Sequence, residues 1–515
     1  MRLLMTHGYM LTGSGSNVYV QNLSRALTKE GHTVHLLCQE TIPPDHDFVD
    51  EWAVVSKSGI ERKGEKESPY PGRCVLYKPD IGDLLPVYVY DDYPGWRVKT
   101  FLDLSDDEFE FYVERNAEAI RTVMEHSDIE AVVTNHSVPG PFIACHALEG
   151  TGAPLLSIVH GSCLQYLARK SERYMSVARE GLSGAEKIIS PSPHGAGTIV
   201  EDFPDMEGKT LALSGGVDTD LFNPNALDKE ALSSLRGGDG RGSEQKAALE
   251  KALSEASGAE ELLASLKNIA ASYEPRAHDA DAGERMKKLL EGEAPLVVYV
   301  GKLIHSKGVH SLLSAFARVR AETGAKLLII GFGTFREGLE AMTKALGDGD
   351  EKSIERLVEL GKRMEGGPSE PLEHFGVSTK IWQDARGMDG SVEFVGPLGH
   401  RELSKVLPAA DVAVVPSIFP EIFGLVAAEF AASGVVPFVA DHSGLSEAGA
   451  IVGKNLPFDT RVGMDGFKGN LSDALVRHLS LPDDERERCA GIVRRNAIES
   501  LGWNSLARDL VSLAR

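Results

Sequence analysis

The chain has 515 residues, of which 42% are hydrophobic and 25% are charged, and its formal net charge at pH 7 is −22. Chains of this length form more than one domain, and this composition is typical of an ordinary soluble globular protein. The strong negative charge disfavours nucleic acid and bare anionic membrane surfaces as partners.

Met1 leads directly into an apolar, strand-like segment, which leaves no room for a signal peptide, and no apolar run is long enough to cross a bilayer. The cysteines form no CxxC pair and no metal-ligand spacing, so reduced and mostly buried thiols are expected. They are Cys38, Cys74, Cys145, Cys163 and Cys489. These features predict a cytoplasmic protein without a transmembrane segment.

Strands and helices alternate through the first half of the chain. Leu3–Thr6 is a short apolar strand, and the Gly-rich loop Gly13–Asn17 leads into a helix from about Val18 to Lys29. His160 directly follows a later apolar run and therefore lies at the carboxyl end of a predicted strand. The other strands expected in this half are Thr33–Cys38, Ala131–Thr134, Leu155–Val159 and Lys187–Ser190.

A second series of strand–helix units follows in the second half. Its strands are expected at Leu296–Val300, Lys326–Ile330, Val392–Val395, Val412–Val415 and Val436–Ala440. Two such series predict an α/β chain with two doubly wound parallel sheets. The ligand of such a fold is expected at the carboxyl ends of the strands, in the cleft between the two halves.

Two charged segments interrupt this alternation, at 225–293 and at 346–389. The first contains the helically spaced runs KAALEKAL and AEELLASL, and the second is helical in places and broken by GGPSEP. For the first segment the spacing favours a solvated helical insertion, and the second is similar. A lid or an oligomer contact is the alternative for the second.

The stretch after the strand Val412–Val415 predicts an anion site. A loop carries Glu421, and helical spacing then begins at Phe423, with Gly424 and Leu425 at the helix start. The free N–H groups and the positive dipole end of such a helix favour an anionic ligand. Glu429, about two turns in, suits the two neighbouring hydroxyls of a ribose. A nucleoside diphosphate is the ligand that fits both features.

Two lysines strengthen this interpretation. Lys302 and Lys307 lie in the loop GKLIHSKGV, between the strand Leu296–Val300 and a helix that begins near Val309. Two ammonium groups there could neutralise a departing diphosphate. An exposed, solvated basic loop is the alternative.

These motifs resemble those of the retaining family 4 glycosyltransferases. PSIFPEIFGLVAAE resembles the E-x7-E signature of that family, and GKLIHSKGV resembles its G-[RK]-x4-K-G element. Lys302 stands where the family more often has arginine, and Ser443-Gly444-Leu445 stands where it has Gly-Gly-Leu. The resemblance implies a GT-B architecture, in which two Rossmann-like domains face each other across a cleft. It also implies transfer of a hexose from a nucleoside-diphosphate sugar with retention of anomeric configuration, without a metal or another cofactor.

Residue roles follow from the same resemblance. It implies that His160 contacts the donor sugar and supports the reacting centre, and we expect Glu421 to bind the sugar hydroxyls and Glu429 to bind ribose. Lys302 and Lys307 stabilise the diphosphate. The remaining donor contacts are expected from Gly13, Gly15, Phe423, Gly424 and Leu425 and from the backbone of Val395 and Leu398 around the base. A uridine carrier is favoured by its frequency in the family, with guanosine and adenosine as alternatives.

The domain limits expected from the resemblance follow the strand series. They are an N-terminal acceptor-side domain over 1–224, a charged insertion or linker over 225–293, a C-terminal nucleotide-sugar-binding domain over 294–490 that includes 346–389, and a helix over 491–515 that crosses back to the first domain.

The acceptor is less well defined. The segment YVYDDYPGWRVK offers Tyr93 and Trp96 for stacking on sugar rings and Arg97 for a phosphate or carboxylate, and a half-buried irregular edge is an equal alternative. A small molecule, a glycan or a lipid-linked acceptor would all fit. Two other functions stay open: a nucleotide-sugar 2-epimerase of the same fold and a non-catalytic nucleotide-sugar-binding protein.

Overall fold

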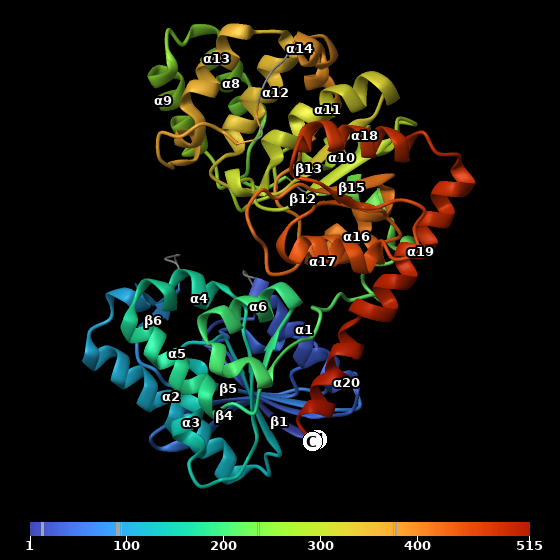
Figure 1. Ribbon diagram of the computed structural model, residues 1–515. Helices are drawn as coiled ribbons and strands as arrows, with labels where there is room; N and C mark the ends of the chain where they lie inside the picture. The colour runs from blue at the N-terminus through green and yellow to red at the C-terminus, as the bar shows by residue number, and fades with distance from the viewer. Residues whose placement is uncertain are drawn as a thin grey trace. The chain divides into compact units, whose positions relative to one another are not determined.

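A computed structural model of the chain describes residues 1–11, 15–88, 93, 95–233, 235, 237–373, 375 and 379–515. The chain divides into two compact units (Figure 1). Unit 1 comprises Met1–Gly216 and Leu501–Arg515, and unit 2 comprises Val217–Ser500. The boundaries therefore lie about eight residues before 224 and about ten after 490, and segment 225–293 lies within unit 2.

Unit 1 is built on a largely parallel sheet. Its strands run in the order β11-β10-β9-β8-β1-β2-β5-β3-β4, in which β3 and β4 pair antiparallel and the other neighbours pair parallel. They are β1 (Arg2–Thr6), β2 (Thr33–Leu37), β3 (Glu51–Ser56), β4 (Gly59–Glu65), β5 (Arg73–Pro79), β8 (Ala131–Asn135), β9 (Leu155–Ile158), β10 (Lys187–Ser190) and β11 (Thr210–Ala212). A separate parallel pair is formed by β6 (Leu84–Val87) and β7 (Arg97–Thr100).

Helices cover both faces of this sheet because successive strand residues point to opposite sides. Leu3 and Met5 of β1 share a buried cluster with residues of α1 and α20, while Leu4 shares another with α2, α3 and α5. The helices are α1 (Gly15–Lys29), α2 (Asp106–His126), α3 (Gly140–Leu148), α4 (Ser162–Tyr166), α5 (Glu172–Gly184), α6 (Pro193–Asp202) and α20 (Trp503–Leu513). The C-terminal helix α20 thus packs on unit 1, beside α1.

Unit 2 contains a parallel sheet in the order β14-β13-β12-β15-β16-β17. Numbered from its first strand this is 3-2-1-4-5-6, the order of doubly wound nucleotide-binding folds. The strands are β12 (Leu296–Val300), β13 (Lys326–Ile330), β14 (Val392–Phe394), β15 (Val412–Val415), β16 (Pro437–Ala440) and β17 (Arg461–Val462). The predicted α/β class with two doubly wound sheets is confirmed.

Helices cover this second sheet, and further helices make up the charged segments 225–293 and 346–389 of unit 2. They are α7 (Lys229–Ser233), α8 (Ser243–Glu255), α9 (Ala259–Ala270), α10 (Ala282–Leu290), α11 (Val309–Thr323), α12 (Arg336–Asp348), α13 (Glu351–Leu360), α14 (Thr379–Ala385), α15 (His400–Val406), α16 (Leu425–Ala432), α17 (Ser443–Val452), α18 (Phe467–Leu479) and α19 (Asp483–Leu501).

Segment 225–293 is helical, and most of its charged side chains are exposed, but a few of its charges are buried against α12. Asp279 is fully buried and accepts two hydrogen bonds from Arg336, at 2.8 and 2.6 Å, while Arg241 is 1% exposed and forms a forked pair with Glu337. Removing one partner of a buried ion pair typically costs about 3–5 kcal/mol, because the other charge stays buried. These buried charges therefore fasten the segment to α12, while most of its other charged side chains face solvent.

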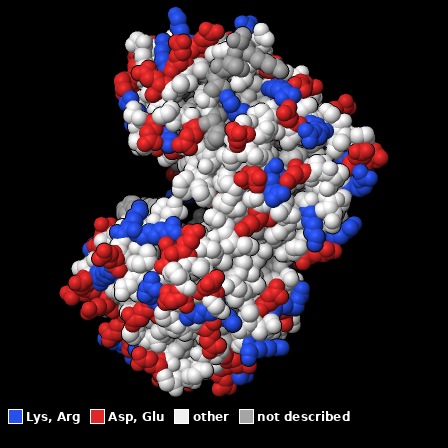
Figure 2. Space-filling model, viewed as in Figure 1, with Lys and Arg blue, Asp and Glu red and all other residues white. Residues whose placement is uncertain are grey.

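The remaining charge is spread over the surface. Acidic and basic side chains intermingle on the face shown in Figure 2, without a large patch of one sign. The thiols of Cys38, Cys74, Cys163 and Cys489 are free and buried, and that of Cys145 is free and half-buried. Of the helices that the structure describes, none is both long and apolar enough to cross a membrane.

Candidate functional site

The strand order of unit 2 places a ligand site between β12 and β15. These strands lie side by side, and the connections from them lead to opposite halves of the sheet. At such a switch point the loops diverge and leave a crevice at the carboxyl ends of the strands. Lys302 and Lys307 follow β12, and Glu421 follows β15. The sheet therefore brings together three of the predicted site residues.

Backbone contacts hold the two loops against each other. The Ile418 N–H donates to the Ser306 carbonyl at 2.9 Å. Gly308 has φ +68°, and a Cβ atom at this position would lie 2.0 Å from the carbonyl oxygen of Pro416. Any larger residue would push the loops apart, so this glycine fixes the position of the neighbouring Lys307.

Lys307 and Glu421 form an ion pair at the switch point. Lys307 Nζ lies 2.6 Å from Glu421 Oε1, and the two side chains are 30% and 23% exposed. The Ser417 hydroxyl donates to the same carboxylate oxygen. Lys302 is exposed, and its carbonyl accepts a hydrogen bond of 2.9 Å from the Tyr299 hydroxyl. An anion that enters here would meet one exposed ammonium group and one shared with a carboxylate.

The start of α16 lies next to this pair along the chain. The helix begins at Leu425 with Gly424 as its N-cap, and Phe423 is buried. Gly424 packs closely on α17, because an added Cβ atom would lie 3.0 Å from side-chain atoms of Leu445 and Ala448. The first-turn N–H groups of a helix have no intrahelical partner and favour an anion.

Glu429 projects from α16 with its side chain 14% exposed. His400 Nε2, at the start of α15, lies 3.4 Å from Glu429 Oε1. His400 was not predicted from the sequence. This residue follows the loop after β14, the loop whose backbone was expected to contact the base of the donor. In that loop Val395 is buried and its N–H donates to the Ile329 carbonyl, while Leu398 is half-buried.

Unit 1 has a switch point of its own, between β1 and β8. His160 follows β9, and its Nε2 lies 2.9 Å from Asn135 Oδ1 at the end of β8. The Asn135 amide nitrogen donates to the Thr6 carbonyl at 3.0 Å, which fixes the amide orientation. His160 therefore donates from Nε2, and its Nδ1 carries the lone pair.

Two further histidines, which sequence reasoning missed, surround His160. His136 follows β8 with a left-handed backbone (φ 70°), and its ring centroid lies 5.0 Å from that of His160 and 5.7 Å from that of His7. Burial lowers the pKa of His7 to about 4 and that of His160 to about 3, and it holds the pKa of His136 well below its usual value. The rings are therefore neutral near pH 7. Their shared signal in sequence is a polar residue directly after a buried strand.

These low pKa values predict that the protein loses stability in mild acid. An unfolded histidine takes up a proton near pH 6.5, whereas His7 and His160 in the folded chain do so near pH 4 and 3. Below pH 6.5 the unfolded chain binds more protons, so the free energy of unfolding falls by up to about 1.4 kcal/mol per pH unit for each such histidine. Urea unfolding between pH 7 and 5 should show this slope, and the variant His160→Gln should show a shallower one. Equal pH slopes in the wild type and in His160→Gln would contradict a lowered pKa for His160.

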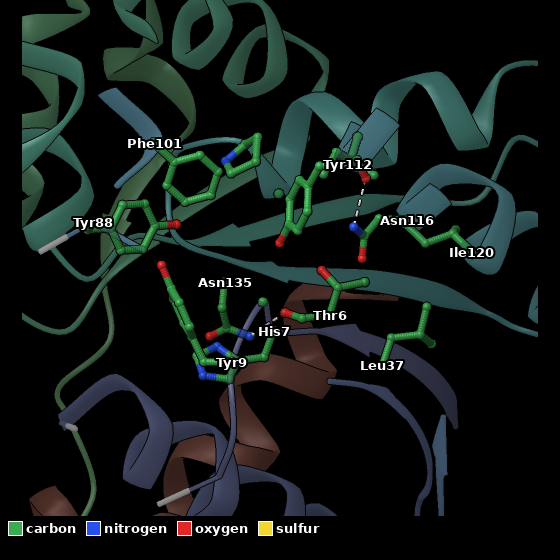
Figure 3. Close-up of a pocket in the computed structure, with 14 residues that line it drawn as sticks. Thr6, His7, Tyr9, Leu37, Tyr88, Phe101, Tyr112, Asn116, Ile120 and Asn135 are labelled. Atoms are coloured by element: carbon green, nitrogen blue, oxygen red, sulfur yellow. Dashed lines mark hydrogen bonds between the residues drawn. The ribbon is translucent and has the colours of Figure 1, made fainter. Parts of the chain in front are cut away.

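A pocket opens at the carboxyl ends of β1, β2 and β8 (Figure 3). Its cavity volume is about 40 Å³, which is room for a few water molecules. The hydroxyls of Tyr112 and Thr6 and the amide of Asn116 turn toward this space. Burial raises the pKa of Tyr9, Tyr88 and Tyr112, so their hydroxyls keep their protons. Aromatic faces beside hydroxyl and amide groups suit a hydroxylated ring.

The predicted acceptor residues all lie in the described part of unit 1, but they do not line this pocket. Tyr93 packs against the buried cluster of α2 and α3, and the Trp96 ring lies 5.1 Å from Lys78 Nζ. Arg97 pairs with Asp83 at 3.3 Å and with Glu108 at 3.2 Å. Gly15 is the first residue of α1, and Gly13 lies outside the described residues. None of the three predicted acceptor side chains is among the described residues that line the pocket.

Two family descriptions match the chain. Residues 13–221 match Glycosyltransferase Family 4, and residues 281–353 and 378–450 match Glycosyl transferases group 1. Together these matches cover more than half of the chain, and they contain β12, β15 and the loops that carry Lys302, Lys307 and Glu421.

Curated relatives are similar over part of their length. An uncharacterized glycosyltransferase of Methanocaldococcus jannaschii is 24% identical over 230 residues, which cover 44% of this chain and 45% of that protein. A D-inositol 3-phosphate glycosyltransferase of Corynebacterium urealyticum is 30% identical over 226 residues, 43% of each chain. The chain thus spans less than half the length of these relatives.

A solved structure with the same architecture is sucrose-phosphate synthase from Thermosynechococcus elongatus. It aligns with a TM-score of 0.58 and 19% identity over 99% of this chain and 98% of that chain. At this identity the likeness shows the fold, which is GT-B. The chain belongs to the GT-B glycosyltransferases, with a Glycosyltransferase Family 4 part in its N-terminal half and a Glycosyl transferases group 1 part in its C-terminal half.

Proposed function

We propose that this glycosyltransferase moves a hexose from a nucleoside-diphosphate sugar to an acceptor hydroxyl with retention of anomeric configuration. The observation that carries the proposal is the Lys307–Glu421 pair at the switch point of unit 2, with Lys302 exposed on the same loop as Lys307. A cationic site beside a carboxylate suits a ligand whose diphosphate is bonded to a sugar with free hydroxyls.

The donor would be held from its two ends. Lys302, Lys307 and the first turn of α16 take the diphosphate, because negative charge grows on it as the sugar departs. Glu429 takes the ribose hydroxyls, and its neighbour His400 limits how the carboxylate can turn. Glu421 takes hydroxyls of the transferred sugar once the diphosphate engages Lys307.

Retention follows if the acceptor attacks the face of the sugar that the diphosphate leaves. The departing phosphate oxygen then receives the proton of the acceptor hydroxyl, so proton transfer requires no side-chain base. In this scheme the lysines supply the positive charge that a metal ion supplies in other transferases, and the protein contributes charge stabilisation and alignment of two substrates.

The acceptor would be recognised by unit 1. The tyrosine-lined pocket at the ends of β1, β2 and β8 has the aromatic, hydroxyl and amide groups that recognise a hydroxylated ring, and it would have to widen to admit one. His160 stays our candidate for a contact to the donor sugar. Arg97 would have to leave Asp83 and Glu108 before it could meet an acceptor phosphate. The mainly neutral lining of the pocket makes a ring hydroxyl a better fit than a charged group.

Incubation with a labelled donor tests the proposed function. We expect free nucleoside diphosphate and a glycosylated acceptor in equal amounts. Epimerised sugar would favour the 2-epimerase, and binding without turnover would favour the non-catalytic protein.

The donor base can be found first by thermal shift, since a ligand at a hundred times its Kd stabilises the folded state by about 2.7 kcal/mol. UDP, ADP and GDP all belong in this screen. Among solved structures with a similar fold, HepE of Anabaena is in complex with UDP, and the catalytic domain of starch synthase IV from Arabidopsis thaliana is bound to ADP.

A further inference from the structure

A chain of hydrogen bonds surrounds the backbone of Glu421. The Glu421 N–H donates to Ser443 Oγ at 2.9 Å, and the Gly444 N–H donates to the Glu421 carbonyl at 2.8 Å. His442 Nδ1 lies 3.0 Å from Ser443 Oγ, and His442 Nε2 lies 2.7 Å from the Ser417 carbonyl. The start of α17 thus binds the 417–421 loop at both of its ends.

The chemistry of these groups fixes the direction of the bonds to the Ser417 carbonyl and from the Glu421 N–H, and it allows a consistent direction for the bond between Ser443 and His442. A carbonyl accepts, so His442 Nε2 carries a proton and donates to Ser417. The Ser443 oxygen already accepts from Glu421, and its own proton can then be donated to the lone pair of His442 Nδ1. The neutral Nε2–H tautomer of His442 satisfies every bond in this set.

Ser443 is held in a strained conformation to make these bonds. Its φ of +50° lies in the left-handed region that favours glycine. Next to it, a Cβ atom on Gly444 would lie 1.9 Å from the Ile422 carbonyl oxygen, so the backbones of α17 and the loop are in direct contact. A serine that keeps a strained backbone while its hydroxyl takes part in two hydrogen bonds indicates that these hydrogen bonds matter for the site.

We propose that His442 and Ser443 are positioning residues that keep Glu421 in place when a donor occupies the site. The inference rests on the proposed function, in which the diphosphate engages Lys307. Lys307 is then shared between Glu421 and the diphosphate. The position of Glu421 is therefore set by the hydrogen bond from Ser417 and by the backbone hydrogen bonds to Ser443 and Gly444. A displaced carboxylate would still allow diphosphate binding but would align the sugar poorly.

Two variants of Ser443 separate the effect of its hydroxyl from the effect of its strained backbone. Ser443→Ala and Ser443→Gly both remove the hydroxyl, and Ser443→Gly also relieves the strained φ. Both should lower kcat for transfer about tenfold and leave the Kd of the cognate nucleoside diphosphate within about twofold. Ser446→Ala is the matched control, since it removes a hydroxyl of the same helix that bonds Asp441 instead. His442→Asn keeps an acceptor near the Nδ1 position and should lose less than His442→Ala.

Hydrogen exchange gives a readout that does not depend on turnover. A peptide that spans 417–424 should exchange faster in Ser443→Ala and Ser443→Gly than in the wild type or in Ser446→Ala. If the wild type transfers no sugar, the proposed function fails, and exchange alone then reports whether the hydroxyl holds the loop. Wild-type exchange in both Ser443 variants, or wild-type kcat in either of them, would overturn the positioning role.

Discussion

Replacing Lys302 or Lys307 with alanine is expected to lower donor turnover by about a hundredfold or more while leaving the fold intact. Removing one group that stabilises developing charge commonly costs this much, because the transition state carries more charge on the leaving group than the bound donor does. Initial-rate measurements at saturating donor and circular dichroism of the purified variants check both parts of the expectation.

The effects of substitution should differ between the two lysines. Lys302 is exposed, and the resemblance places arginine at its position, so Lys302→Arg should keep most of the activity. Lys307→Ala also removes the partner of Glu421, which stays bonded to Ser417. An exposed lysine of α9, Lys267, provides the control variant Lys267→Ala. Near-normal turnover in either site variant would remove that lysine from the mechanism.

Ten strands of the two sheets were predictable because they are buried on both faces. Such strands read as continuous apolar runs. The observed β10, β12, β13 and β15 have the predicted bounds, and β1, β2, β8, β9, β14 and β16 differ by one residue at one end. The helix α1 begins at Gly15 rather than at Val18, which is the usual uncertainty at a helix end.

The strands between residues 51 and 100 were not predicted, and neither were β11 and β17. Although β5 and β6 are mostly buried, β4 lacks the signal of a buried strand. β4 has the sequence GIERKGE and is mostly exposed, and it pairs with β3 at the edge of the sheet. The role of segment 225–293 was hidden for a different reason. Arg241, Asp279 and Arg336 lie far apart in the chain, and a sequence does not distinguish charges that pair in the interior from charges that face solvent.

The candidate site was predictable in outline from one rule, that parallel strands end together. That rule places Lys307 and Glu421 at one edge, and the strand order supplies the missing fact that β12 and β15 are neighbours. The hydrogen bonds of His442 and Ser443 depend on the exact approach of α17 to the loop, which no local pattern encodes. For the same reason the contact of His400 with Glu429 became visible only in the structure, whereas His136 directly follows a buried strand and could have been found from the sequence.

The two glutamates of the E-x7-E pattern should respond differently to the same isosteric change. Glu429 is assigned to ribose, which does not change during the reaction. Glu429→Gln replaces a charged acceptor by a neutral amide, and a hydrogen bond to a charged group contributes about 1.5–3 kcal/mol. Affinity for the cognate nucleoside diphosphate should therefore fall about ten- to a hundredfold. Calorimetric titration measures this change, and kcat at saturating donor should fall much less.

Glu421→Gln should instead lower kcat more than it weakens diphosphate binding. The carboxylate lies beside the proposed sugar site, where the anomeric carbon gains positive character in the transition state, and a neutral amide loses that interaction. The variant also takes away the charged partner of Lys307, so this lysine meets the diphosphate without a competing carboxylate and the measured affinity should hold or rise. A loss of diphosphate affinity in Glu421→Gln together with normal affinity in Glu429→Gln would reverse the two roles. A residue that touches only the nucleotide affects binding of the nucleotide, so its replacement must change the affinity for the diphosphate.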